Sequence, residues 1–167
     1  MSAETFWNWS VRIYKTPELA PLLEQLQDDY ALDVNLILWC AWAGDCGVIL
    51  PSLSIRKAYD ISQRWAAEVS GPLRTARRAL KTPPRQAEPE AAAALRENVK
   101  AMELEAERIQ QNILEALAED AEPVRELEPK TAARRNLAEY AALARVTEKP
   151  GFSTSDLQKT LDLIYPG

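Results

Sequence analysis

The segment Asp33–Trp42, DVNLILWCAW, constrains the fold more than any other part of this sequence. Eight of its ten residues are apolar, so a helix over this segment has almost no polar face. It opens with Asp33, whose side chain can accept a hydrogen bond from a free amide at a helix start. Gly44 and Gly47 follow it and favour a helix end. A helix that is apolar on nearly all sides is buried among other helices. We therefore expect a central helix capped by Asp33.

Helical spacing continues along the rest of the chain. Apolar residues recur at three- and four-residue steps, and the alternating patterns typical of strands are nearly absent. The sequence predicts an all-α protein, a single-domain helical bundle of about six to seven helices over residues 1–167. Its expected parts are an N-terminal bundle over residues 5–81, a proline-rich linker over 82–89, and a long helix with C-terminal helices over 90–165.

Local signals predict where some of these helices begin or bend. Thr16 followed by Pro17 is expected to start one helix, and Thr131 is expected to cap another. Within the N-terminal bundle, Gly71 and Pro72 predict a kink or a short break, because proline deletes an intrahelical hydrogen bond and collides with the preceding turn.

The longest helix is predicted over residues 89–120. Its apolar positions are spaced close to a heptad repeat, and they are Leu95, Val99, Met102, Ala106, Ile109, Ile113 and Leu117. Such a seam packs against a partner helix. Two interpretations remain open at this point. The partner helix belongs to the same chain, or it belongs to a second copy in a homodimer formed through residues 95–117.

The composition excludes several classes of function. The chain has no histidine, which removes Ser-His-Asp catalysis, Cys-His catalysis and histidine-ligated zinc. None of its five glycines is spaced as a phosphate-binding loop. We therefore favour a protein that is not an enzyme, and we expect neither a cofactor nor a metal.

Cysteine usage and the length of the apolar runs indicate a cytoplasmic protein. Cys40 lies inside the apolar segment, where a free thiol behaves as a small hydrophobe, and Cys46 is too near it to build a disulfide framework. The N-terminus shows no basic region followed by an apolar stretch, so no secretory signal is expected. The longest apolar run is about half as long as a membrane span.

Residues 74–85, RTARRALKTPPR, carry the sharpest charge feature. The segment has five basic residues and no acidic one, in a chain whose net charge is −5. Four of them share one side of the predicted helix and are called the basic face below: Arg74, Arg77, Arg78 and Lys81. These cations can bind the phosphates of RNA or lipid, or the acidic groups of a partner protein. They can equally pair with the acidic long helix of the same chain or remain solvated.

A second candidate site lies before the central helix. The stretch from Asp28 to Asp33, DDYALD, is similar to the aspartate-rich motifs with which helical prenyl synthases hold magnesium diphosphate. A second motif of this kind is not evident, because Glu103, Glu105 and Glu107 alternate and do not share one helix face. A solvated helix end leading into the Asp33 cap explains the same residues.

Tryptophan is concentrated in the first 65 residues. Core packing explains this, because the helices there need bulky faces. An exposed tryptophan pair would instead mark a binding groove between helices, with Asn35 at its rim. The candidate pocket residues are Asp33, Asn35, Trp39 and Trp65, with Asp29 close by in the sequence.

Four motifs carry a family resemblance: F-W-x-x-S near the N-terminus, L-Q-D, D-V-N-L-x-L-W-C-x-W, and W-x-x-x-V-x-x-P-L-R-x-x-R-R-x-L-K. They resemble an uncharacterised family of small proteobacterial hypothetical proteins with a domain of unknown function. The match runs from Phe6 to about Leu117. The resemblance implies no established activity. In this family, relatives are often encoded beside an ABC-F type ATPase that acts on ribosomes. The resemblance therefore implies a translation-linked, ribosome-associated partner. The resemblance also picks out Asp33, Asn35, Trp65, Arg74, Arg77 and Arg78.

Two hypotheses follow. The first is a non-enzymatic cytoplasmic adaptor that binds an acidic or phosphate-bearing partner, a protein or more weakly an RNA, through the basic face. The second is a small helical enzyme or carrier with an inter-helical pocket near Asp29, Asp33 and Asn35 that binds a metal diphosphate or another small ligand.

Overall fold

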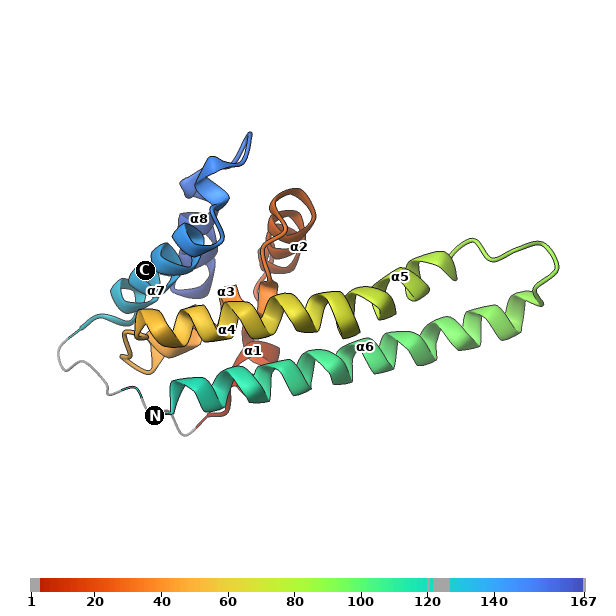
Figure 1. Cartoon of the computed structure of the whole chain (residues 1–167), viewed down its shortest axis with the longest axis horizontal. Helices are drawn as coiled ribbons and strands as arrows, with labels where there is room; N and C mark the ends of the chain where they lie inside the picture. Colours follow the sequence, from red (N-terminus) through yellow and green to blue (C-terminus); the bar gives the residue numbers. More distant parts are fainter. Residues whose placement is uncertain (1–3, 120, 122–126, 167) are drawn as a thin grey trace. The chain divides into compact units, whose positions relative to one another are not determined.

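The computed structural model describes residues 4–119, 121 and 127–166, and over these residues it contains helices and no strand. The elements are α1 (Phe6–Ile13), α2 (Leu19–Tyr30), α3 (Val34–Asp45), α4 (Ser52–Trp65), the π-helix η1 (Ala66–Ser70), α5 (Gly71–Ala79), α6 (Pro89–Ala118), α7 (Pro129–Leu143), the 3-10 helix η2 (Val146–Glu148) and α8 (Thr154–Ile164) (Figure 1). The predicted all-α fold is confirmed. None of these helices, within the described ranges, is long and apolar enough to cross a membrane.

The chain divides into two compact units. Unit 1 comprises Met1–Asp60 and Gln111–Gly167, and unit 2 comprises Ile61–Gln110. Both α4 and α6 contribute residues to each unit. The single domain over residues 1–167 stays a prediction.

The predicted central helix is α3, in unit 1. Every residue from Asn35 to Gly44 is buried, and α1, α2 and α7 pack against this helix. Asp33 Oδ1 accepts a hydrogen bond from the Leu36 amide at 3.2 Å, which confirms the predicted cap. Gly47, with a φ of 70°, follows the end of the helix, as expected for a residue that must adopt the left-handed region. The apolar segment is therefore the core of unit 1.

At Gly44, α3 and α7 pack backbone against backbone. A β-carbon added to Gly44 would lie 2.4 Å from the Ala133 nitrogen and 2.6 Å from both the Cα and the Cβ of Ala133. Carbon atoms in van der Waals contact are about 3.5–4.0 Å apart. The two helices can approach this closely only because position 44 has no side chain.

Asn136 of α7 holds the chain that leaves α3. Its Oδ1 accepts from the Leu50 amide at 2.9 Å, and its Nδ2 donates to the carbonyls of Cys40 and Val48 at 3.2 and 3.0 Å. All of these groups are buried, where an unpaired polar group destabilises the fold. One amide side chain thus satisfies two backbone groups of the segment between α3 and α4 and bonds to one carbonyl of α3.

Two of the predicted helix starts are wrong. α2 begins at Leu19 rather than at Pro17, because the amides of Lys15 and Thr16 still bond to carbonyls of α1 and the chain then turns through Glu18, which has a φ of 66°. α7 begins at Pro129 after Glu128, so Thr131 lies in the first turn. Proline is suited to the first helical position, where an amide would have no partner.

Unit 2 contains the predicted interruption at Gly71–Pro72, which is a π turn and not a break. The Gly71 amide donates to the Ala66 carbonyl five residues earlier, and the helix then continues as α5. This wider turn accommodates Pro72, which has no amide hydrogen and would collide with the preceding turn of a regular α-helix. A β-carbon on Gly71 would lie 2.4 Å from Ala66 O, so the turn requires glycine.

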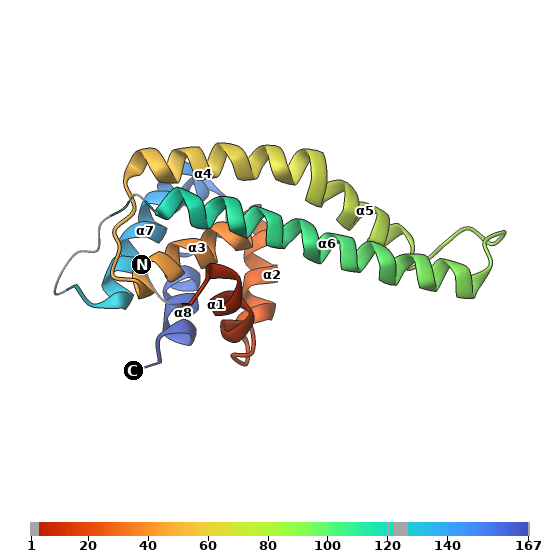
Figure 2. The same ribbon diagram turned by 90° about the horizontal axis from the view of Figure 1, so that it is seen from below.

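Within unit 2, α5 and α6 run side by side and are joined by residues 80–88 (Figures 1 and 2). Two polar contacts, one of them buried and the other part-buried, join the end of α4 to α6 within unit 2. Trp65 Nε1 donates to the Ala106 carbonyl at 3.2 Å, and Gln110 Nε2 donates to Ser62 Oγ at 3.0 Å. The predicted linker over residues 82–89 is therefore, within unit 2, the connection of a helical hairpin.

The predicted heptad seam of α6 is divided between the interior and the surface. Ala106 is buried and Val99 is half-buried, whereas Leu95, Met102 and Ile109 are exposed at seven-residue intervals. The buried positions of α6 in unit 2 are instead Ala92, Glu103, Ala106 and Gln110. Half of that inward face is polar, which the apolar spacing alone did not indicate.

Candidate partner-binding site

The basic face is organised around one carboxylate, that of Glu103 on α6. Arg74 Nε lies 3.2 Å from Glu103 Oε1, and Arg77 donates through Nε to Oε2 at 2.5 Å and through Nη2 to Oε1 at 3.4 Å. The Glu103 side chain is 8 % exposed, whereas those of Arg74 and Arg77 are 25 % and 23 % exposed. The arginines therefore cover the carboxylate and form the outer layer of the cluster.

The charge state of Glu103 follows from this packing. Burial raises the pKa of its carboxyl group, but the hydrogen bonds and the positive charges of Arg77 and Arg74 outweigh that effect, so the pKa lies below its ordinary value. Glu103 is ionised at neutral pH.

The structure thus shows the pairing of Arg74 and Arg77 with the long helix that the sequence left open as an alternative. Arg78 and Lys81, the other members of the basic face, are exposed. Arg78 lies on α5 and Lys81 in the turn after it, near the connection to α6. That these four residues bind a partner stays a prediction.

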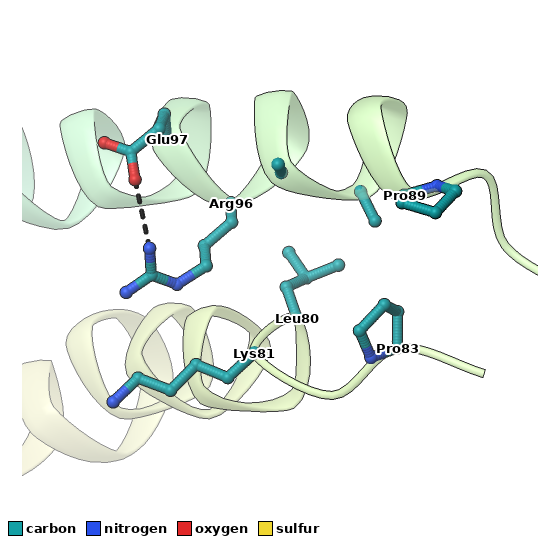
Figure 3. Close-up of a pocket in the computed structure, with 8 residues that line it drawn as sticks. Leu80, Lys81, Pro83, Pro89, Arg96 and Glu97 are labelled. Atoms are coloured by element: carbon teal, nitrogen blue, oxygen red, sulfur yellow. Dashed lines mark hydrogen bonds and ion pairs between the residues drawn. The ribbon is translucent and has the colours of Figure 1, made fainter. Parts of the chain in front are cut away.

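Beside the basic face, the end of the helical hairpin contains a groove of about 490 Å³. Its lining residues come from the end of α5, the connection and the start of α6, and they are Leu80, Lys81, Pro83, Pro89, Ala92, Ala93, Arg96 and Glu97. In Figure 3 the Leu80 side chain points towards α6 and the Arg96 guanidinium points towards α5. The groove therefore has an apolar part near the connection and a charged part further along the hairpin.

Arg96 is the lining residue with an unsatisfied group. Its Nη1 lies 3.1 Å from Glu97 Oε1, and the side chain as a whole is 31 % exposed. Its Nε is buried and, among the residues that the structure describes, has no hydrogen-bond partner. A buried donor without an acceptor destabilises the protein that contains it. Arg96 was not predicted as a site residue, although it lies at helical spacing between Ala92 and Glu103 on the inward side of α6.

The other predicted site residues make structural contacts within their own units. Asp33 is the cap of α3, and Asn35 accepts a hydrogen bond from Gln111 Nε2 at 2.8 Å. Trp39 is fully buried, and its Nε1 has no hydrogen-bond partner among the described residues. Trp65 belongs to unit 2, where it bonds to Ala106. These contacts agree with the explanation by core packing, and a pocket role stays a prediction.

Asp28 and Asp29 lie exposed at the end of α2. Over the described part of the chain, no three acidic or cysteine side chains are grouped so that they could hold a metal ion.

The family model described as "Protein of unknown function (DUF2390)" matches residues 5–114. The chain belongs to this family. The matched region of this DUF2390 protein runs from the cap of α1 through most of α6, and so includes α3, the basic face and the groove. No curated protein and no solved structure matches the chain.

Proposed function

We propose that the protein is a non-enzymatic adaptor that binds an acidic or phosphate-bearing partner through the basic face. The observation that carries this proposal is the sharing of one carboxylate, Glu103, by two arginines. The shared carboxylate holds both arginine side chains in place next to the exposed cations Arg78 and Lys81, so that the four cations are presented together to an external anion.

The surrounding charges support the same proposal. Arg78, Lys81 and Arg85 are exposed on or near the same end of the hairpin, and no acidic residue lies between positions 74 and 85. A cationic patch on a chain of net charge −5 attracts an anionic partner locally and repels it elsewhere, which orients the encounter. The proposed location is the bacterial cytoplasm, and the proposed partner is a translation-linked, ribosome-associated protein.

The test is capture of partners by the tagged protein from the cells that express it. The informative variant is Arg78→Glu/Lys81→Glu, which reverses exposed charges and leaves both arginine contacts to Glu103 intact. The matched control is Arg56→Glu/Lys57→Glu, which makes the same charge change at two exposed cations of α4. We expect a partner that the parent and the control capture and the basic-face variant loses. Identical partners for all three proteins would contradict the proposal.

One observation supports the alternative function, a small helical enzyme or carrier. The buried Trp39 indole lies one helical turn after Asn35, and its Nε1 has no partner among the residues that the structure describes; a small bound ligand could supply one. The test is the melting temperature in the presence of magnesium with diphosphate compounds, for the parent and for Asp33→Asn. A rise that is lost in Asp33→Asn would favour this function, and no rise with any compound would count against it.

A further inference from the structure

The groove at the end of the α5–α6 hairpin has chemistry that the basic face does not. Its floor is apolar, formed by Leu80, two prolines and two alanines. Its charged part contains the cations Lys81 and Arg96 together with one acceptor, Glu97. A ligand that fits must therefore offer an apolar surface, an acidic group and a hydrogen-bond donor at once.

We infer that this groove binds a short acidic peptide segment of the partner, in which a carboxylate side chain pairs with the Arg96 guanidinium and an adjacent apolar side chain packs on Leu80 and the prolines. This inference rests on the proposed function, because it assigns the acidic partner to a defined place beside the basic face. It goes beyond that function by naming the ligand class and the residue that recognises it.

The charge of the groove is the first argument for a carboxylate. Among the lining residues, the two cations Lys81 and Arg96 outnumber the one acidic residue, Glu97. A guanidinium donates charge-assisted hydrogen bonds to carboxylate oxygens. The Arg96 side chain is 31 % exposed, so part of it remains accessible to an incoming carboxylate.

Glu97 is the argument for a peptide over a nucleic acid. Its carboxylate lines the groove and repels a phosphate backbone, whereas it can accept a hydrogen bond from the backbone amide of a peptide. The apolar part of the groove also favours a peptide over a nucleic acid. Leucine-like side chains gain free energy by packing on Leu80, Pro83 and Pro89, whereas a phosphate loses hydration there.

The experiment measures binding of a fluorescein-labelled, end-blocked hexapeptide of alternating glutamate and leucine by fluorescence anisotropy. Comparison ligands are the same peptide with glutamine in place of glutamate and a single-stranded RNA hexanucleotide. The variants are Arg96→Gln and the matched control Arg108→Gln, which removes an exposed arginine of α6 outside the groove. Circular dichroism verifies that each variant is folded.

We expect the glutamate peptide to bind the parent and Arg108→Gln with affinities within about twofold, and to bind Arg96→Gln at least about tenfold more weakly, the change expected for one lost charge-assisted hydrogen bond. The glutamine peptide should bind at least about tenfold more weakly for the same reason. Nitrogen–proton correlation spectra provide a second readout. The arginine Nε–H signal that disappears in Arg96→Lys should shift when the glutamate peptide is added to the parent.

Three results would overturn the inference: no binding of the glutamate peptide at about 1 mM, which marks the weak end of specific affinities; equal binding by Arg96→Gln; or tighter binding of the RNA. If partner capture depends on Arg78 and Lys81 but peptide binding does not depend on Arg96, the inference about the groove is wrong and the proposed adaptor function stands. If capture does not depend on Arg78 and Lys81 and peptide binding does not depend on Arg96, both proposals are wrong.

Discussion

Replacing Gly44 by alanine should destabilise the protein, although the same change in most helices is stabilising. Alanine is favoured over glycine by about 1 kcal/mol in a helix interior. Here the new β-carbon would lie 2.4 Å from the Ala133 nitrogen, about 1 Å inside normal contact. Because backbone atoms cannot rotate away, α3 and α7 must separate.

The magnitude follows from these two opposing effects. Overpacking a well-packed interior costs about 1–3 kcal/mol, and a contact with backbone belongs near the upper end of that range. Subtracting the helix propensity of about 1 kcal/mol leaves a net loss of about 2 kcal/mol in the free energy of unfolding. Urea denaturation followed by circular dichroism measures this difference for the parent and Gly44→Ala.

A double variant makes the test sharper. In Gly44→Ala/Ala133→Gly the two side chains no longer meet, but the Ala133 nitrogen and Cα would still lie 2.4 and 2.6 Å from the new carbon. The double variant should therefore remain at least as unstable as Gly44→Ala. Stability of Gly44→Ala equal to or above the parent, or recovery in the double variant, would refute the reasoning.

Four further predictions concern other parts of the fold. Folding lowers the pKa of Glu103 from its ordinary value of 4.5, so its contribution to stability is present above that value and is lost as the pH falls through the lowered pKa. The free energy of unfolding should therefore fall more for the parent than for Glu103→Gln between about pH 7 and pH 3, and an equal fall in urea denaturation would contradict this. Asn136→Leu should lower the free energy of unfolding by about 3 kcal/mol, or about 1 kcal/mol for each of three buried hydrogen bonds. A loss below about 1 kcal/mol in urea denaturation would show that these hydrogen bonds do not stabilise the fold. Gly71→Ala should lower the melting temperature, because Ala66 O occupies the space of the β-carbon; an increase would show that the π turn does not need glycine. If the exposed residues Leu95, Met102 and Ile109 of α6 join two copies, light scattering should give a dimer mass for the parent and a monomer mass for Met102→Glu. A monomeric parent would exclude the homodimer.

The fold was predictable from the sequence where a local signal and the apolar pattern agree. The cap at Asp33 and the apolar segment behind it act within a few residues of one another, so α3 was found with its correct start. The start of α7 was misplaced because Thr131 and Pro129 are competing signals, and proline is the more suited to the first position. The interruption at Pro72 was expected, but its form as a π turn depends on the hydrogen bond between Gly71 and Ala66.

The candidate site was predictable only in part. Residues 74–85 are conspicuous as a run of like charges in one short segment. The role of Glu103 was not visible, because its partners lie 26 and 29 residues earlier in the chain and meet it only when the hairpin folds. Arg96 was missed for the same reason. Its position on the inward side of α6 became apparent only with the buried neighbours Ala92 and Glu103.

The π turn between α4 and α5 also has a consequence for comparing sequences. In an α-helix each residue advances the side-chain direction by about 100°. The π turn holds one residue more than an α turn, because the Gly71 amide donates to a carbonyl five residues earlier instead of four. Deleting one residue between Ala66 and Ser70 would restore a regular helix, and Arg74 and Arg77 would keep the positions from which they reach Glu103. A relative that is one residue shorter within this segment would therefore present the same side chains along α5. Alignments of such relatives must place the gap between Trp65 and Pro72 before they equate any cation of the basic face.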